Sequence, residues 1–235
     1  MRNAYSVNER FVTQYALRII LLVIGLTLAG CDSNDAIESA AVAPAALDPN
    51  TLFYDGFSPG QTGGWHLERD DMGQTAVFDD QLVISINAPN TLQYSSLANE
   101  LFDDFELTVD LRQLQGAPSS SFGVLFRMVS PEQFYRFEIT GDGFYMIERR
   151  DNNGQWTRFV PDWTATPAIN QGLNAMNQLT ITAVGPSMRF AVNGAFLQEI
   201  NDATYSLGNI GLDAGTFGQT GLQVAFDNVH VSRVN

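Results

Sequence analysis

Three charged side chains could form a polar row across neighbouring strands. A four-residue loop at SPEQ places Arg127 opposite Arg136, and a tight turn at GDG places Arg136 opposite Glu148. Planar charged groups hydrogen-bond to adjacent hydroxyl groups, so such a row could anchor a polyhydroxylated ligand. Adjacent like charges need compensation, and Glu148 is the residue of the row that could supply it. The row therefore indicates either a ligand site or a surface ion-pair ladder.

Aromatic side chains could complete a site of this kind. Trp65, Trp156 and Trp163 all lie in turn-rich segments, and the faces of aromatic rings cover the apolar C–H surfaces of sugar rings. Packing in the core or at its rim is the alternative role for each of the three.

The usual signatures of catalysis are missing from the sequence. His66 and His230 are far apart and lack the spacing of metal ligands. The sequence contains no nucleophile elbow, phosphate-binding loop or dinucleotide fingerprint. We therefore expect structural or solvent-exposed roles for both histidines, and no catalytic residue is assigned.

Charge excludes one class of partner. The chain has a formal net charge of -14, and all 12 basic residues are arginines spread among 26 acidic ones. Binding to nucleic acid needs a clustered basic patch that neutralises phosphates, and the sequence has none. The hydrophobic content of 45% is enough for one sizeable core.

Alternation of apolar and polar residues dominates the chain from Thr51 almost to its end. The stretch DFELTVDLR alternates in this way, and similar stretches follow, separated by turn signals such as GDG, DNNG and VGPS. So many amphipathic strands need a second sheet to cover their apolar faces. We predict an all-β, antiparallel two-sheet jelly-roll sandwich over residues 51–235, with a core that contains Phe105, Leu107, Val109, Val124, Phe126, Phe137, Ile139 and Ile147.

The N-terminal segment has the pattern of an export signal. Three arginines precede the apolar run at residues 19–29, which is too short for a comfortable transmembrane helix. The sequence Leu28-Ala29-Gly30-Cys31 that follows resembles the lipobox of bacterial lipoproteins. This resemblance implies a signal peptide over residues 1–30 and lipidation of Cys31, the only cysteine. Residues 31–50 then read as a flexible tether. The protein would be held on the extracytoplasmic side of a bacterial membrane, in contact with it only through the lipid.

The strand succession resembles the concanavalin A-like lectin/glucanase jelly roll. FDDFELTVDLR, SFGVLFR, YRFEIT, NQLTITAVGPSMRFAVNG, GNIGLDAG and VAFDNVHV are similar to bacterial domains classed with the 3-keto-disaccharide hydrolases and the laminarinase-like glycosidases. One departure is Met176-Asn177, where those domains often have Trp-Asn. The Glu-x-Asp-x-x-Glu pattern of the laminarinase-like enzymes is also absent.

The resemblance implies a glycan or cell-envelope polysaccharide as the ligand, and the missing Glu-x-Asp-x-x-Glu pattern favours binding without cleavage. A glycoside or 3-keto-disaccharide hydrolase with an atypical active site is the alternative, and a structural envelope domain without a small ligand is another. The resemblance also implies a structural calcium ion between the first and last strands. Asp55 and Asp227 are its predicted carboxylate ligands, although both could instead cap turns.

Replacement of Cys31 by serine tests the anchor. Because a diacylglycerol and an amide-linked chain together hold a protein stably on a bilayer, we expect Cys31→Ser to be released or left unprocessed. Cell fractionation checks the release, and mass spectrometry of the wild-type protein checks the modification. An unmodified Cys31 in the wild type would show that the prediction is wrong.

Overall fold

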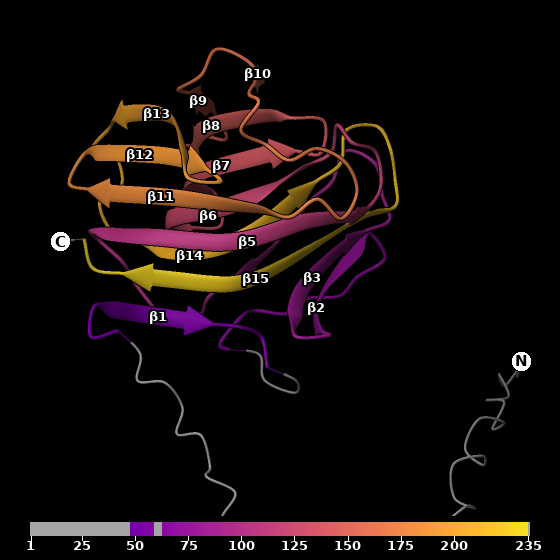
Figure 1. Ribbon diagram of the computed structural model, residues 1–235, viewed down its shortest axis with the longest axis horizontal. Helices are drawn as coiled ribbons and strands as arrows, with labels where there is room; N and C mark the ends of the chain where they lie inside the picture. Colours follow the sequence, from indigo (N-terminus) through magenta and orange to yellow (C-terminus); the bar gives the residue numbers. More distant parts are fainter. Residues whose placement is uncertain (1–47, 59–62, 235) are drawn as a thin grey trace, which may run out of the picture. The chain divides into compact units, whose positions relative to one another are not determined.

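The computed structural model describes residues 48–58 and 63–234, which fold as two β-sheets packed on each other (Figure 1). The predicted signal peptide, Cys31 and nearly all of the tether lie outside the described residues. No helix within the described part of the chain has the length and apolarity to cross a membrane.

The first sheet has eight strands. Seven of them run in the order β13-β12-β11-β5-β15-β3-β2, and β1 also pairs with β15. Their bounds are β1 (Thr51–Asp55), β2 (Gly73–Phe78), β3 (Gln81–Ile86), β5 (Phe105–Gln115), β11 (Asn177–Val184), β12 (Ser187–Val192), β13 (Ala195–Asn201) and β15 (Leu222–Ser232).

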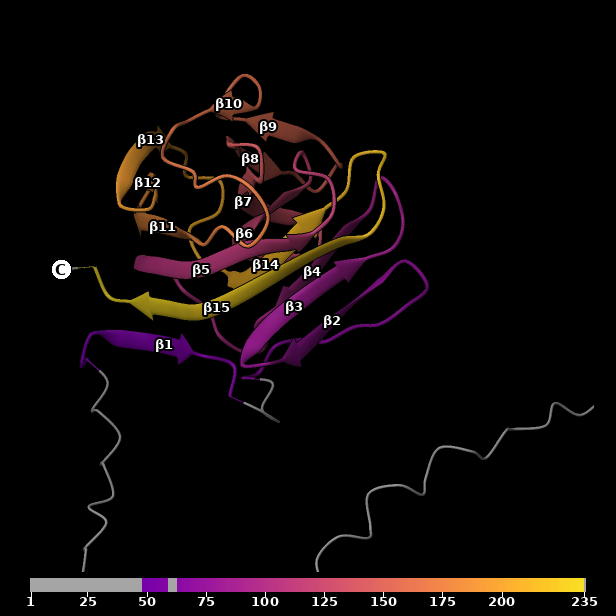
Figure 2. The same ribbon diagram turned by 45° about the vertical axis from the view of Figure 1, so that its right-hand side comes forward.

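The second sheet has seven strands. Its order is β10-β8-β7-β6-β14-β4, and β9 also pairs with β8, so that β9 and β10 lie beside β8 (Figure 2). The bounds are β4 (Leu92–Ser96), β6 (Ser121–Ser130), β7 (Gln133–Thr140), β8 (Phe144–Arg150), β9 (Trp156–Arg158), β10 (Thr164–Ala165) and β14 (Asn209–Gly215). All strand pairs in both sheets are antiparallel, as predicted.

Alternation along each strand builds the core between the sheets. In β5 every second residue is buried, starting at Phe105, while the residues between them are exposed or half-buried. Each of the eight predicted core residues is at most 1% exposed. Phe190 of β12 packs against Phe126 and Phe137 of the other sheet, and its ring centroid lies 5.9 and 5.1 Å from theirs. These aromatic contacts stabilise the packing of the two sheets on each other.

The face of the second sheet that points away from this core carries the candidate site, and we call it the site face. Its residues are those that alternate with the core residues of β4, β6, β7, β8 and β14. In β7, for example, Tyr135, Phe137 and Ile139 belong to the core, and therefore Arg136 and Glu138 lie on the site face.

Truncation of Phe137 measures the contribution of the core. Phe137 is fully buried, so Phe137→Ala should lower the free energy of unfolding by about 3–5 kcal/mol. Phe78→Ala is the control, because Phe78 is 66% exposed. Urea denaturation followed by fluorescence measures both, and an equal effect of the two substitutions would contradict the packing described here.

Candidate functional site

Arg136 is the centre of the site face. It lies opposite Glu148 in the β7–β8 pairing, as the hairpin register predicted, and its guanidinium group forms an ion pair with that carboxylate. The same guanidinium lies 3.1 Å from Oε2 of Glu138 and 3.8 Å from Oδ2 of Asp213. One cation therefore faces three carboxylates, and its side chain is only 13% exposed.

Gly123 allows two of these carboxylates to approach each other. It lies in β6 between Glu138 of β7 and Asp213 of β14, and it pairs with both. A Cβ atom at this position would lie 2.1 Å from the carbonyl oxygen of Phe137, so no other residue fits without a backbone shift. With no side chain between them, Glu138 and Asp213 lie next to each other beside the same guanidinium.

Burial changes the protonation of this pair. Glu138 and Asp213 are both fully buried, and the cation beside both of them is the guanidinium of Arg136. Burial raises the pKa of Glu138, against the opposing charge of Arg136. Burial, and after it the charge of Glu138, raises the pKa of Asp213 well above its ordinary value. The pair therefore keeps a proton to a higher pH than two isolated carboxyl groups would.

Burial also disfavours the charge on Arg136, but the carboxylates of Glu138, Asp213 and Glu148 outweigh it and raise the pKa of Arg136. Arg136 is therefore a permanent cation, held in a fixed position by its acidic neighbours. A fixed guanidinium with oriented N–H groups is well suited to recognise oxygen-rich ligands.

Trp156 and two further arginines form the rim of the site. The guanidinium carbons of Arg136 and Arg150 lie 4.4 and 5.0 Å from the centroid of the Trp156 ring. Trp156 is 36% exposed, and its ring meets Phe134 edge to face. Nε of Arg158, whose side chain is 52% exposed, lies 3.8 Å from the second oxygen of Glu148. The rim thus combines an aromatic ring with exposed hydrogen-bond donors.

Arg127 does not belong to this row, and the prediction that it lies opposite Arg136 is wrong. A bulge shifts the β6–β7 register after Phe126, and Leu125 takes the place opposite Arg136. Arg127 itself has a φ of 45° and is fully buried. Its guanidinium group donates hydrogen bonds to the carbonyl oxygens of Asp103, Gly185 and Tyr205, so it ties three loops together.

The other two predicted tryptophans lie away from Arg136. Trp65 is 4% exposed and belongs to the core, so its predicted role in ligand binding is wrong. Trp163 packs partly against the core and lines a separate pocket of about 300 Å³ together with Phe144 and Phe217. Of the three, only Trp156 contacts the charged residues of the site face.

The predicted calcium ligands have other partners. Asp55 accepts hydrogen bonds from the backbone N–H of Phe57 at 2.7 Å and from the indole N–H of Trp65 at 3.0 Å. Burial raises the pKa of Asp227, and its Oδ1 accepts a hydrogen bond from the N–H of Asn228. No group of three or more His, Cys, Asp and Glu side chains within the described ranges could hold a metal ion. A calcium ion here would need backbone carbonyl oxygens as well, and the site stays a prediction.

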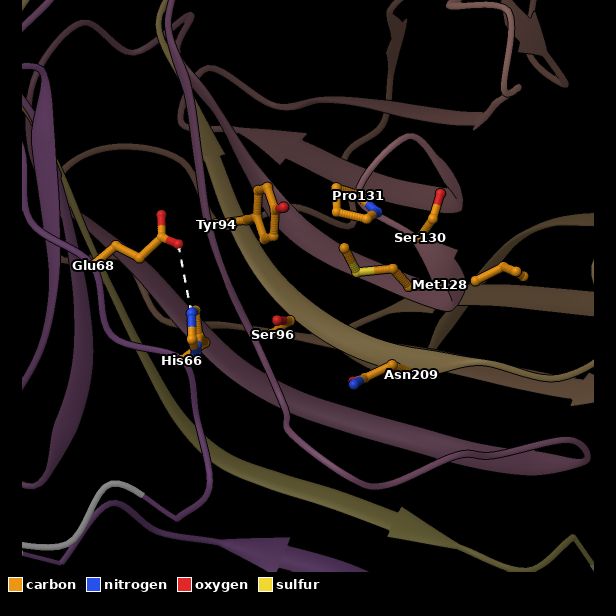
Figure 3. A pocket seen from close by; sticks show the side chains of 9 residues that line it. His66, Glu68, Tyr94, Ser96, Met128, Ser130, Pro131 and Asn209 are labelled. Atoms are coloured by element: carbon orange, nitrogen blue, oxygen red, sulfur yellow. Dashed lines mark ion pairs between the residues drawn. The ribbon is translucent and has the colours of Figure 1, made fainter.

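A second pocket, which we call the Tyr94 pocket, opens on the site face. It has a volume of about 340 Å³ and is lined by His66, Glu68, Tyr94, Ser96, Met128, Val129, Ser130, Pro131 and Asn209. Figure 3 shows His66 and Glu68 on one side of Tyr94, and Ser130 and Pro131 on the other. Nε2 of His66 lies 3.8 Å from Oε1 of Glu68, and both side chains are largely exposed.

Sequence reasoning missed Glu138 and Asp213. Glu138 could have been found, because it lies two residues after Arg136 and strand alternation places both on one face. Asp213 carried no comparable signal. Its strand β14 lies between β4 and β6, neither of which is its neighbour in the sequence.

Comparisons with known proteins agree with this architecture. A family model described as the 3-keto-alpha-glucoside-1,2-lyase-like domain matches residues 49–232. No curated protein matches the sequence. The chain is similar to the carbohydrate binding module CBM66 from Bacillus subtilis, with 15% identity and a TM-score of 0.57 over 72% of this chain and 95% of that one.

Two enzymes have the same fold. The catalytic domain of an endo-1,3-beta-glucanase (laminarinase) from Thermotoga petrophila matches with 9% identity and a TM-score of 0.56, over 77% of this chain and 96% of that one. The Bacillus licheniformis beta-glucanase matches with 12% identity and a TM-score of 0.56, over 80% of this chain and 100% of that one. The fold is therefore the predicted concanavalin A-like jelly roll, which binding modules and hydrolases share, so fold alone does not decide the activity.

The buried carboxyl pair makes stability depend on pH. Because the folded state raises the pKa of Asp213 above its unfolded value, the pair stabilises the fold most at low pH and loses this contribution as pH rises above about 4. Asp213→Asn should remove this loss, so we expect a flatter dependence of the free energy of unfolding on pH than in the wild type.

Asp71→Asn is the control, because Asp71 is exposed. Urea denaturation at several pH values between 5 and 8 measures the slope. Parallel pH profiles for the wild type and Asp213→Asn would show that the pair does not hold a proton in the folded state.

Proposed function

We propose that the folded part of the chain, which belongs to the 3-keto-alpha-glucoside-1,2-lyase-like domain family, binds a carbohydrate on the site face without cleaving it. The observation that carries this proposal is the fixed guanidinium of Arg136 between Glu148 and the ring of Trp156. A carbohydrate binding module is among the proteins that share this fold.

The geometry suits sugar hydroxyl groups. Such a group accepts a hydrogen bond from a guanidinium N–H and donates one to a carboxylate, and Arg136, Glu148 and Arg158 offer both partners side by side. The partly exposed Trp156 supplies an apolar surface at the same place. Each hydrogen bond between the sugar and the protein replaces a hydrogen bond to water, so the net gain in binding free energy per contact is small. We expect a dissociation constant in about the millimolar to micromolar range.

The proposal includes the location of the domain. Cys31 would carry the lipid, and residues 31–50 would tether the domain outside a bacterial membrane, where it meets glycans of the cell envelope. The LAGC sequence after an apolar run supports this part of the proposal.

A second candidate function is cleavage of a 3-keto-sugar by elimination. A base would remove the proton at C2, which the C3 carbonyl makes acidic. The electron pair of that C–H bond then forms the C1–C2 double bond, while the C1–O bond breaks and the leaving oxygen takes up a proton. Glu148 could act as the base, and Arg136 could stabilise the enolate oxygen.

The proton-holding pair of Glu138 and Asp213 is the observation that favours this second candidate. Both side chains are fully buried, however, so neither can contact a substrate directly. Binding without cleavage is therefore the function that the geometry supports best.

Substitution of Arg136 tests the proposal. Arg136→Lys keeps the positive charge that the carboxylates require but loses the planar fork, so glycan affinity should fall about tenfold. Arg189→Lys is the matched control, because Arg189 is on β12 of the other sheet with its side chain 61% exposed. Glycan-array screening of the full chain followed by isothermal titration measures the affinities.

Two results would decide against this proposal. If neither Arg136→Lys nor Trp156→Ala changes the affinity for glycans, Arg136 and Glu148 form a salt bridge that has no role in binding. Cleavage of a glycoside or 3-keto-glucoside that disappears in Glu148→Gln would establish an enzyme instead. Product analysis then distinguishes elimination, which yields an unsaturated sugar, from hydrolysis, which adds water.

A further inference from the structure

Two asparagines of the chain are followed directly by glycine, in the pairs Asn153-Gly154 and Asn193-Gly194. In such a pair the backbone nitrogen of the glycine can attack the side-chain carbonyl carbon of the asparagine, because glycine has no Cβ atom that blocks the approach. Ammonia then leaves, and a carboxylate takes the place of the amide. Both asparagines are exposed, so access to water does not distinguish them, but their side-chain contacts do.

Asn193 is held by its side chain in the turn that joins β12 to β13. Its Nδ2 atom donates hydrogen bonds to the carbonyl oxygen of Ala168 and to Oδ1 of Asn177, both at 2.8 Å. Its Oδ1 atom accepts a hydrogen bond from the backbone N–H of Gln178 at 2.9 Å. The side chain must leave these three partners before Gly194 can attack it, so the fold protects Asn193.

Asn153 lies in the loop between β8 and β9 and is held by fewer contacts. Within the described part of the chain its side chain has one hydrogen bond, which Oδ1 accepts from the backbone N–H of Gln155 at 3.0 Å. The attacking nitrogen of Gly154 must also leave the carbonyl oxygen of Asp151, to which it donates at 2.8 Å. Strand β9 that follows has only three residues, two of them exposed. Loops beside such short, exposed strands open at a low cost in free energy.

We propose that Asn153 is a site of spontaneous deamidation, and that the carboxylate it gains changes the rim of the site face. The nitrogen of Gly154 forms a bond to Cγ of Asn153 and gives up its proton, while the bond from Cγ to Nδ2 breaks and the amide leaves as ammonia. Water then opens the resulting succinimide ring, at Cγ to give aspartate or at the main-chain carbonyl carbon to give isoaspartate. This inference does not rest on glycan binding, since the reaction needs only the chain and water.

The new negative charge would appear beside Arg150. The guanidinium group of Arg150 donates a hydrogen bond to the carbonyl oxygen of Gly154 at 2.7 Å, and a Cβ atom on Gly154 would lie 3.5 Å from its Nη2 atom. None of the ion pairs between described residues involves Arg150. Its guanidinium carbon lies 5.0 Å from the centroid of the Trp156 ring. A carboxylate at residue 153 would therefore draw this cation away from the ring.

Comparison of the two asparagines in one sample tests the reaction. After incubation of the full chain at mildly alkaline pH, peptide mapping by mass spectrometry measures deamidation at each site. Asn153 should react at least about tenfold faster than Asn193, because Asn193 must break two more side-chain hydrogen bonds. In the chain unfolded by urea the two rates should become similar. Equal rates in the folded chain, or an Asn153 that stays intact there, would overturn the proposed site.

The indole N–H signal of Trp156 in NMR spectra tests the effect on the rim. Asn153→Asp carries the charge of the product from the start, so it should shift this signal in the same direction as ageing of the wild type. Asn153→Gln keeps an amide that cyclises slowly and should not shift with age. Asn87→Asp is the matched control, because it adds the same charge at an exposed position between β3 and β4.

Arg150→Gln tests whether the arginine transmits the change. In this background Asn153→Asp should no longer shift the signal of Trp156. A shift that is equally large without Arg150, or a Trp156 signal that is the same in Asn153→Asp and the fresh wild type, would overturn the inferred effect on the rim. Deamidation at residue 153, measured by mass, would still stand in that case.

Discussion

The charge balance at Arg136 is the constraint on which the site face depends. Glu138 and Asp213 are fully buried, and such carboxylates are stable only beside a cation or with a proton. Arg136 supplies the cation, and it joins the β7–β8 hairpin to β14, whose Asp213 lies 77 residues after Arg136 in the chain. Loss of this one guanidinium would leave two acidic groups without compensation, at a cost of about 3–5 kcal/mol.

Strand β7 connects this charge cluster to the hydrophobic core. Tyr135, Phe137 and Ile139 point into the core, while Arg136 and Glu138 point to the site face. A slip of one residue in the pairing would place the charges in the core and the aromatic rings in solvent. The packing of Phe137 against Phe190 therefore fixes the register that brings Arg136 to Glu148. The same eight residues of β7 therefore fill the core and position the charges of the site face.

Local patterns predicted the fold and part of the site. Alternation identified the strands and the core, and the length of the GDG turn placed Arg136 opposite Glu148. The same reasoning failed for Arg127, because a bulge with a left-handed residue interrupts the register on the other side of β7. Asp213 could not be predicted, since its place beside Glu138 depends on the order of strands in the sheet and on the missing side chain of Gly123. Trp65 looked like a loop residue, but the carboxylate of Asp55 anchors its indole group in the core.

The position of β1 affects how the domain is presented when it is immobilised. Among the strands that the structure describes, β1 pairs only with β15, so it belongs to the sheet that does not carry Arg136. A solid support that is coupled to the chain ahead of Thr51 would therefore attach on the side of the first sheet. The site face of the second sheet would stay accessible to large polymers that diffuse slowly. Because the chain has no lysine, amine-directed coupling cannot attach to side chains of the site face. Capture through the N-terminal end would thus give a uniformly oriented layer in which steric access to Trp156 and Tyr94 is kept.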